Sequence, residues 1–370
     1  MTDECNPSTR IKERVLVSSF LPASTGSGVE TFVRLLSEAL ARHGREVLVI
    51  DSTQVYLPGP LRGVRPLAAW VIGRRINRMA SERDVILCNG FFSWNARRRK
   101  SAVVYHGTER GRVIGTRSWM GFFRRLTVRW ISATLDKRAG KGRTVIAVSG
   151  AVGDEIREYY GHDVHAVIPN AVNLGVFKPS PDKRGLRAAF GLPEDKFLVL
   201  FVGPADPRKG LEWIIRDLQP RFPKDFHLVL RTKMTRNQPN STVIGRLSTN
   251  ELVRLYNACD VLLMPSAYEG CSYVIVEALA CGLPVVSSHT GAAVDMSNNN
   301  QLGKYVVNGL DAEKYLSCME RLASSADEWT ETSSAARKYA EEYHSITDFE
   351  RKYLQVIVEL QTSQDRPRDF

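Results

Sequence analysis

The chain has 370 residues, 43% hydrophobic and 25% charged, a composition that excludes disordered and fibrous proteins and favours a globular protein of two domains. Its formal net charge of +11 predicts an anionic partner, which is a nucleotide, a nucleic acid or an anionic membrane surface. No apolar run approaches the roughly 20 residues of a membrane span and no segment has the pattern of a signal peptide, so we expect a cytoplasmic protein.

The first half of the chain predicts alternating strands and helices. A strand at Val15–Ser19, a helix at Val29–Arg42 and a strand at Glu46–Ile50 form the expected opening. Short apolar runs predict further strands at Val85–Cys88, Ala102–Tyr105 and Thr144–Val148. The turn-rich passage from Ile168 to Pro181 predicts a linker.

The same alternation begins again after the linker. The expected elements are Phe197–Val202 (strand), Leu211–Leu218 (helix), Leu228–Leu230 (strand), Asn250–Ala258 (helix) and Val261–Met264 (strand). The final part predicts helices at Asp311–Ser324, Asp327–Tyr343 and Phe349–Gln361. Two such alternating halves predict two doubly wound α/β domains, with a site in the cleft between them.

Two carboxylates flank the most apolar stretch of the chain. Tyr273 to Cys281 is apolar except at Glu277, so a buried helix there leaves a carboxylate that needs partners. Glu269 falls in the turn after a strand, where open α/β sheets bind ligands, and Ser272 is a candidate N-cap. Carboxylates suit a ligand rich in hydroxyl groups, and N–H groups at a helix start suit an anion. A sugar joined to a phosphate has both hydroxyl groups and an anion. The simpler alternative is that Glu269 and Glu277 are two solvated glutamates on the surface.

A glycine-containing loop precedes the first predicted helix. Gly26 and Gly28, with Asp51 ending the next strand, favour a dinucleotide site and therefore a nicotinamide-dependent oxidoreductase as the competing function. Thr31 occupies the third small position, which weakens that interpretation. A glycine at a helix start still brings N–H groups close to a diphosphate, and a loop without a ligand is the other alternative.

Two further positions follow predicted strands. Arg208 and Lys209 lie after the strand that ends at Val202, where a basic pair neutralises phosphate oxygens, although charge pairs usually face solvent. His106 follows Tyr105 at the end of another strand. A lone histidine is usually structural, but this place makes it a candidate site residue.

The segment Arg110–Arg143 is strongly basic. It holds ten lysines and arginines against one acid, Asp136, and its aromatic residues recur at helical spacing. Such a basic amphipathic helix predicts peripheral contact with an anionic membrane through Arg117–Arg143. Core packing of the apolar face is the alternative, and we expect no nucleic-acid partner because the segment has no recognition motif beyond its charge.

Several motifs occur in a fixed order along the chain. They are Ser27-Gly28-Val29-Glu30, His106-Gly107, Val148-Ser149, Pro169-Asn170-Ala171-Val172-Asn173, Arg208-Lys209-Gly210, Gly245, Pro265-Ser266, and Glu269 with Glu277 after seven intervening residues. Together they resemble the retaining glycosyltransferases of family 4, from about Val15 to Phe349. The resemblance implies a GT-B fold, in which two Rossmann-like domains face across a cleft and a C-terminal helix crosses back. The implied domains are 1–172 with 346–370, which binds the acceptor, and 173–345, which binds the nucleotide sugar.

The resemblance also implies a role for each matching residue. Glu277 would accept hydrogen bonds from the ribose, Glu269 from the transferred sugar, and Lys209 would stabilise the leaving diphosphate. Gly28 would let the first domain close on the diphosphate, and His106 would contact the donor sugar or the acceptor. The remaining donor-binding positions are Gly203, Arg231, Gly245, Gly270, Cys271, Ser272, Tyr273 and Val274, with Arg208 as a further catalytic candidate.

By the same resemblance, the enzyme needs no metal or cofactor and retains the configuration of the transferred sugar. The donor would be a UDP or GDP sugar, and the acceptor a hydroxyl of a lipid-linked glycan, a polysaccharide precursor or a small molecule. Pro204 stands where the family usually has an arginine, for which Arg208 or Arg231 would substitute. Cys271 and Ser272 replace an aromatic residue and a glycine. These departures leave a degenerate nucleotide-sugar-binding protein as an alternative.

Overall fold

A computed structural model of the protein describes residues 14–22, 28–55, 64–116, 128–233 and 238–362. Its tertiary contacts group the chain into two compact units. The first consists of Met1–Tyr105, Ile131–Ile146 and Glu350–Phe370, and the second of His106–Trp130 and Ala147–Phe349. The domain boundaries expected from the sequence, 1–172 with 346–370 and 173–345, stay a prediction.

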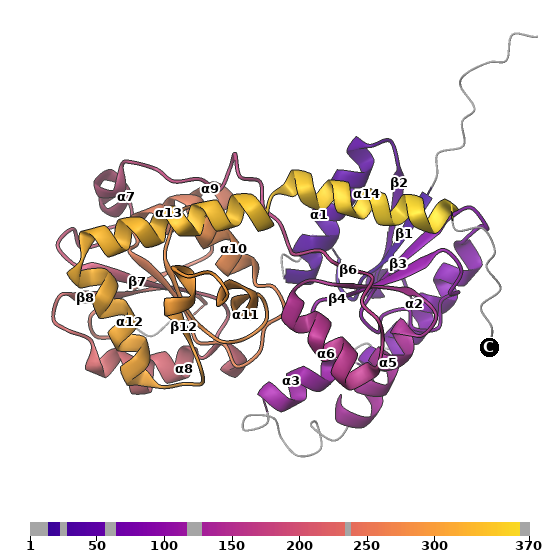
Figure 1. Ribbon diagram of the computed structural model, residues 1–370, viewed down its shortest axis with the longest axis horizontal. Helices are drawn as coiled ribbons and strands as arrows, with labels where there is room; N and C mark the ends of the chain where they lie inside the picture. The colour runs from indigo at the N-terminus through magenta and orange to yellow at the C-terminus, as the bar shows by residue number, and fades with distance from the viewer. Residues whose placement is uncertain (1–13, 23–27, 56–63, 117–127, 234–237, 363–370) are drawn as a thin grey trace, which may run out of the picture. The chain divides into compact units, whose positions relative to one another are not determined.

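Two six-stranded sheets carry the α/β fold (Figure 1). The first has the order β2-β1-β3-β4-β5-β6, and the second the order β12-β11-β10-β7-β8-β9. The strands of the first are β1 (Arg14–Ser18), β2 (Glu46–Ile50), β3 (Val85–Asn89), β4 (Ser101–Tyr105), β5 (Thr144–Ala147) and β6 (Ala166–Val167). Those of the second are β7 (Phe197–Val202), β8 (Phe226–Arg231), β9 (Ser241–Ile244), β10 (Val261–Met264), β11 (Val285–Ser288) and β12 (Val306–Val307). The predicted pair of doubly wound, Rossmann-like domains is confirmed.

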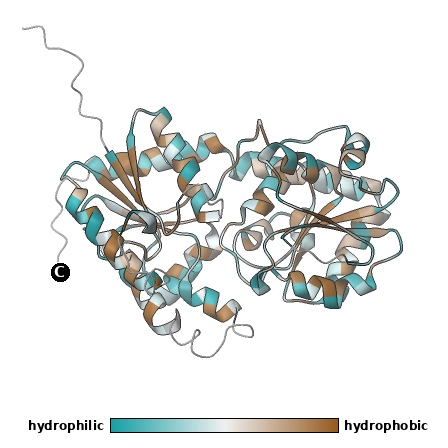
Figure 2. Cartoon of the chain, turned by 180° about the vertical axis from the view of Figure 1, so that it is seen from behind, coloured by the Kyte–Doolittle hydropathy of each residue, from teal (hydrophilic) through white to brown (hydrophobic). Residues whose placement is uncertain are grey.

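Helices pack on both sheets, and the bounds predicted for several of them agree with the structure to within one residue. The α-helices described are α1 (Gly28–Arg42), α2 (Arg65–Met79), α3 (Glu109–Gly115), α5 (Ala133–Gly140), α6 (Gly150–Tyr160), α7 (Lys183–Ala189), α8 (Leu211–Trp213), α9 (Thr249–Ala258), α10 (Tyr273–Ala280), α11 (Ala292–Met296), α12 (Ala312–Ser324), α13 (Ala326–Tyr343) and α14 (Ile346–Thr362). Figure 2 shows apolar strands inside each unit and polar outer faces on many of the helices around them. Burial of those strands and of the inner helix faces stabilises each unit.

The C-terminal helix α14 packs on the first unit from Glu350 onward. The rings of Phe32 on α1 and Tyr353 on α14 are 5.6 Å apart in an edge-on arrangement, and Arg42 forms an ion pair with Glu350. Both side chains of the aromatic pair are fully buried, so the contact belongs to the core. The predicted return of the last helix to the N-terminal part of the chain is confirmed.

The central strands of the second unit, β7 and β10, are almost completely buried. Phe201, Leu230 and Leu263 meet in one apolar cluster between the sheet and helix α12. The predicted helix at Leu211–Leu218 differs in detail, because only Leu211–Trp213 is α-helical and Ile214–Leu218 continues as a π-helical turn. The bounds predicted for β7 and β10 are confirmed.

The basic segment Arg110–Arg143 is not one helix. It contains α3, a π-helical turn at Val128–Ser132 and α5, while residues 117–127, with most of its aromatic side chains, lie outside the described residues. Gly142 has a φ of +72°, which ends the helical run and turns the chain into β5. Arg143 is therefore buried, and it donates to the carbonyl of Ala139 at 2.6 Å. The prediction that it belongs to a basic surface was wrong.

None of the described helices combines the length and the apolar character that crossing a membrane requires.

Candidate functional site

Lys209 and Glu269 form an ion pair at one edge of the second sheet. The distance from Lys209 Nζ to Glu269 Oε1 is 2.5 Å, and the two side chains are only 14% and 12% exposed. Lys209 ends a short 3₁₀ turn after β7, and Glu269 lies in the loop after β10. Because β7 and β10 are parallel neighbours, their carboxyl ends meet at this edge.

The two loops also touch through their backbones. The Ala267 N–H donates to the Arg208 carbonyl at 2.8 Å. Gly210 has a φ of +77°, and a Cβ there would lie 2.5 Å from the Pro265 carbonyl oxygen. Only glycine fits such a conformation and such a close approach. The loop geometry therefore fixes the separation of Lys209 and Glu269.

Glu277 lies within α10 and has the partner that its apolar surroundings predict. The Tyr256 hydroxyl, from α9, donates to Glu277 Oε2 at 2.8 Å. Burial raises the pKa of Glu277 to about 7, although the Tyr256 hydrogen bond and the positive charge of Arg231 both act in the opposite direction. Arg231 ends β8, so three elements converge on this carboxylate.

The loop that joins Glu269 to α10 is held on several sides. A Cβ on Gly270 would lie 2.0 Å from the backbone oxygen of His106, and one on Gly291 would lie 2.2 Å from the Gly270 carbonyl oxygen. The Ala292 N–H donates to that same Gly270 carbonyl at 2.7 Å. The Asn170 amide donates to the carbonyl of Cys271 at 2.6 Å. The start of α10 is therefore rigidly placed.

The expected backbone donors, Cys271 to Val274, span the N-terminal turn of α10. Ser272 is the N-cap, as the sequence predicts, and its side chain makes no capping hydrogen bond. Burial raises the pKa of the Cys271 thiol to about 12, which keeps it protonated at neutral pH. A thiol in that state is a poor nucleophile, so Cys271 contributes its backbone and its volume to the site.

His106 follows β4 and lies beside this loop in the second unit. Burial lowers the pKa of its imidazole to about 4, so the ring is neutral at physiological pH. A neutral imidazole has one hydrogen-bond donor and one acceptor, and it carries no charge.

The remaining predicted positions of the second unit fall at strand ends. The Gly203 N–H donates to the Arg231 carbonyl at 3.2 Å, and Gly245 follows β9 with no atom within 4 Å of a Cβ placed on it. Arg208 is partly exposed, with its guanidinium 3.6 Å from the Asp206 carboxylate. β7, β8, β9 and β10 thus place Lys209, Arg231, Gly245 and Glu269 at the carboxyl edge of one sheet.

One cluster near the site has no sequence signal of its own. Tyr268, next to Glu269, donates its hydroxyl to Glu155 Oε2 at 2.8 Å and accepts the Thr108 N–H at 2.6 Å. The Thr108 hydroxyl donates to the same Glu155 oxygen at 2.5 Å. Burial raises the pKa of Glu155, with both hydrogen bonds acting against that change. These residues are 47 to 160 positions apart, so only the folded chain shows the cluster.

The predicted positions in the first unit are less informative. Gly28 begins α1, but residues 23–27, with Gly26, lie outside the described residues. Asp51 caps a 3₁₀ turn, where its Oδ1 accepts the Thr53 N–H at 2.8 Å. This capping role explains the position of Asp51 without a bound nucleotide.

Metal-ligating side chains are not gathered in the part of the chain that the structure describes, where no group of three His, Cys, Asp or Glu residues could hold an ion. Independence of a metal or cofactor stays a prediction.

Two family models match the chain. Residues 26–176 match the model described as "Glycosyltransferase Family 4", and residues 196–325 match "Glycosyl transferases group 1". A D-inositol 3-phosphate glycosyltransferase of Streptomyces bingchenggensis is 26% identical over 229 residues, which are 55% of this chain and 50% of that protein. The match thus spans about half the length of such curated relatives.

Solved structures show the same fold. Sucrose-phosphate synthase from Thermosynechococcus elongatus aligns with a TM-score of 0.77 and 20% identity, over 94% of this chain and 99% of the other. Anabaena HepE, solved in complex with UDP-glucose, aligns with a TM-score of 0.71 and 18% identity, over 94% and 99% of the two chains. At these identities the likeness establishes the architecture.

Proposed function

Since the chain belongs to the glycosyltransferases of family 4 and has their GT-B fold, we propose that it transfers a sugar from a nucleoside diphosphate sugar to an acceptor hydroxyl. The observation that carries the proposal is the Lys209–Glu269 ion pair, 2.5 Å long and largely buried, next to the N-terminal turn of α10. A cation, a carboxylate and backbone N–H groups at one sheet edge suit the two halves of such a donor.

Glu277 would bind the ribose in this proposal. Its carboxylate is half-buried and keeps one oxygen, Oε2, on the Tyr256 hydroxyl, so the other is available to a ribose hydroxyl. A hydrogen bond from the ligand to the charged form would lower the pKa of Glu277 from about 7. Donor binding would therefore release a proton near neutral pH, and a ligand that binds this carboxylate would bind more tightly above pH 7 than below it.

Lys209 would act on the leaving group. In the free protein its ammonium is compensated by Glu269, so no isolated buried charge exists before the donor binds. As the bond between the sugar and the diphosphate breaks, negative charge develops on the phosphate, and the ammonium would stabilise it. Glu269, released in part from Lys209, would accept hydrogen bonds from the hydroxyls of the transferred sugar.

We also propose that transfer retains the anomeric configuration and requires no metal ion. Leaving-group charge would be met by Lys209, with Arg208 or Arg231 supplying the second cation in place of the arginine that Pro204 replaces. The leaving phosphate would help to deprotonate the acceptor on the same face of the sugar. NMR of the product's anomeric proton, with EDTA present, tests both statements. An inverted product would refute retention, and loss of transfer in EDTA would refute metal independence.

The donor is proposed to be a UDP or GDP sugar, and the UDP-glucose complex of HepE supports the first. A panel of UDP, GDP and ADP sugars tests the assignment by thermal stabilisation and by donor hydrolysis, because a ligand that binds only the folded state raises its stability. Stabilisation without hydrolysis or transfer would favour the degenerate binding protein that the Pro204, Cys271 and Ser272 departures suggest. Stabilisation by none of the sugars would contradict the proposal.

A further inference from the structure

Helix α2 of the first unit has an unusual charge distribution. Its 15 residues, Arg65–Met79, include four arginines and no aspartate or glutamate. One face is apolar and buried, with Ala69, Ile72 and Ile76 in the core. The arginines near the other face are therefore not needed to make the helix amphipathic, and neutral polar residues would serve as well.

The helix is fixed in place from behind. A Cβ on Gly73 would lie 2.0 Å from the Asn95 side-chain oxygen, so helix and loop are in close contact. The Asn95 amide donates to the Trp70 carbonyl at 3.0 Å, and the Asn77 amide donates to the Asn95 carbonyl at 3.1 Å. The outward side chains of α2 consequently project from a rigid support.

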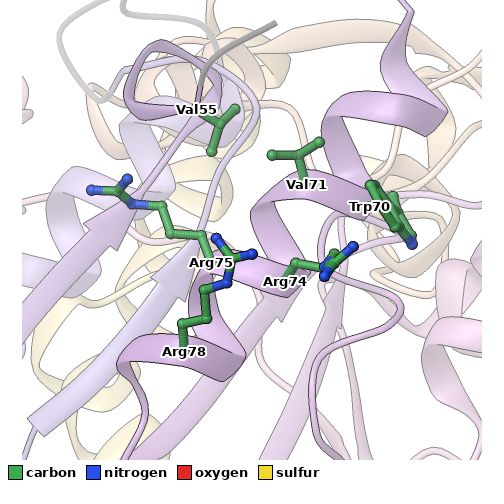
Figure 3. A pocket seen from close by; sticks show the side chains of 6 residues that line it. All are labelled: Val55, Trp70, Val71, Arg74, Arg75 and Arg78. Atoms are coloured by element: carbon green, nitrogen blue, oxygen red, sulfur yellow. The ribbon is translucent and has the colours of Figure 1, made fainter.

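A cavity of about 290 Å³ opens on that outward face. It is lined by Val55, Trp70, Val71, Arg74, Arg75 and Arg78 (Figure 3). The guanidinium of Arg74 reaches the Trp70 ring, 4.8 Å from its centroid, which holds the arginine against the wall of the cavity (Figure 3). The cavity combines an apolar wall with three positive charges.

Among the described residues, these three arginines have no acidic partner. No carboxylate in the described ranges forms an ion pair with Arg74, Arg75 or Arg78. Other arginines of the same unit do have such partners, since Arg14 pairs with Asp84 at 2.7 Å and Arg34 with Glu38 at 3.0 Å. Three like charges around one cavity repel each other, and a bound anion would relieve that repulsion.

We propose that this cavity binds a phosphoryl group. Guanidinium groups match phosphate oxygens through paired hydrogen bonds, which a simple point charge does not do. The apolar wall of Val55, Trp70 and Val71 suits an organic group attached to the phosphate. Such a phosphoryl group comes either from a free phosphorylated molecule or from the headgroup of an anionic lipid. None of these residues belongs to the proposed donor site, so phosphoryl binding here does not depend on the proposed transferase function.

Calorimetric titration of the full chain with inorganic phosphate tests the free-ligand source. The pocket variant Arg74→Gln, Arg75→Gln, Arg78→Gln is compared with the control Arg83→Gln, Lys224→Gln, Lys338→Gln. The control removes the same three charges from exposed positions outside the cavity. We expect one phosphate site to be lost from the pocket variant alone, with any phosphate held elsewhere on the protein unchanged in both.

Co-sedimentation with phosphatidylcholine vesicles, with and without phosphatidylglycerol, tests the lipid source on the same variants. Binding to the anionic vesicles that only the pocket variant loses assigns the site to a headgroup. An equal loss of vesicle binding in the two variants would show an effect of net charge and would overturn the proposal. Wild-type protein that binds neither phosphate nor anionic vesicles would also overturn it. Replacing the three arginines by lysine keeps the charge and should weaken phosphate binding about tenfold, because the paired hydrogen bonds are lost.

Discussion

The Nζ of Lys209 lies 2.5 Å from Oε1 of Glu269, although the two residues are 60 positions apart in the chain. The ion pair lies at the carboxyl edge of the second sheet, and both of its side chains are mostly buried. Each residue protects the other from the cost of an unpaired buried charge. The pair therefore links the stability of the second unit to its proposed catalytic role.

Removal of one partner should destabilise the protein more than removal of both. Lys209→Ala leaves the Glu269 carboxylate without its partner, and we expect the free energy of unfolding to fall by about 2–4 kcal/mol. The double variant Lys209→Ala, Glu269→Ala removes both charges and should lose less stability than Lys209→Ala alone, and therefore less than the sum of the single changes. Chemical denaturation of all three measures the coupling.

The exposed pair Arg184–Glu194 is the matched control for this cycle. Its side chains are 85% and 49% exposed, so Arg184→Ala should cost about 1 kcal/mol or less. Additive effects at Lys209 and Glu269 would show that the pair is not coupled in solution.

The stability of the unliganded protein should fall with rising pH because of Glu277. Its pKa is about 7 in the folded protein and 4.5 ordinarily, so the folded state binds more protons between these values. The free energy of unfolding therefore decreases as pH rises from about 4.5 to about 7, by at most about 3.5 kcal/mol at about 1.4 kcal/mol per pKa unit. Denaturation curves of wild type and Glu277→Gln, recorded at several pH values across this range, isolate the contribution.

Glu277→Gln cannot ionise, so its curve should lack this decrease. Tyr256→Phe removes the hydroxyl that stabilises the carboxylate, and its decrease should be larger in total and extend to higher pH. A pH dependence that is the same in wild type and Glu277→Gln would mean that Glu277 does not titrate in this range.

Tyr268 should position the loop that carries Glu269. Tyr268→Phe leaves the Thr108 N–H and the Glu155 carboxylate without the hydroxyl that joins them, at a cost of about 1–3 kcal/mol. With an identified donor, we expect kcat to fall more than KM changes, since the loop would be less well placed for the transition state. The control is Tyr343→Phe, at a tyrosine that is 46% exposed. An equal loss of kcat in the two variants would show that Tyr268 does not position the loop.

Gly270 should tolerate no side chain. A Cβ there would lie 2.0 Å from the His106 oxygen, so Gly270→Ala must displace one of two loops, at a cost of about 1–3 kcal/mol. Gly245→Ala is the matched control for stability, because nothing lies within 4 Å of its Cβ position. Thermal melts of the two variants compare them directly, and an undisturbed Tm in Gly270→Ala would show that the loops separate readily.

The sequence predicts where strands lie along the chain better than it predicts contacts between side chains. β7 and β10 are short apolar runs bounded by turns, so their limits follow from local pattern. The partner of Glu277 could not be predicted from local sequence, because Tyr256 lies in another helix. Only the packing of α9 beside α10 brings its hydroxyl to the carboxylate. Composition likewise predicted a basic surface that includes Arg143. The chain instead turns at Gly142, and the Arg143 side chain is buried.

Turnover of the stabilising donor by wild type and by Lys209→Ala tests the central claim most directly. The nucleoside diphosphate released from the best sugar of the panel is measured at saturating donor, with the folded state of each variant checked by its melting curve. We predict that Lys209→Ala binds the donor but releases nucleoside diphosphate about 100- to 1,000-fold more slowly, because leaving-group charge is no longer stabilised. Release at the wild-type rate from a folded Lys209→Ala protein would contradict the account.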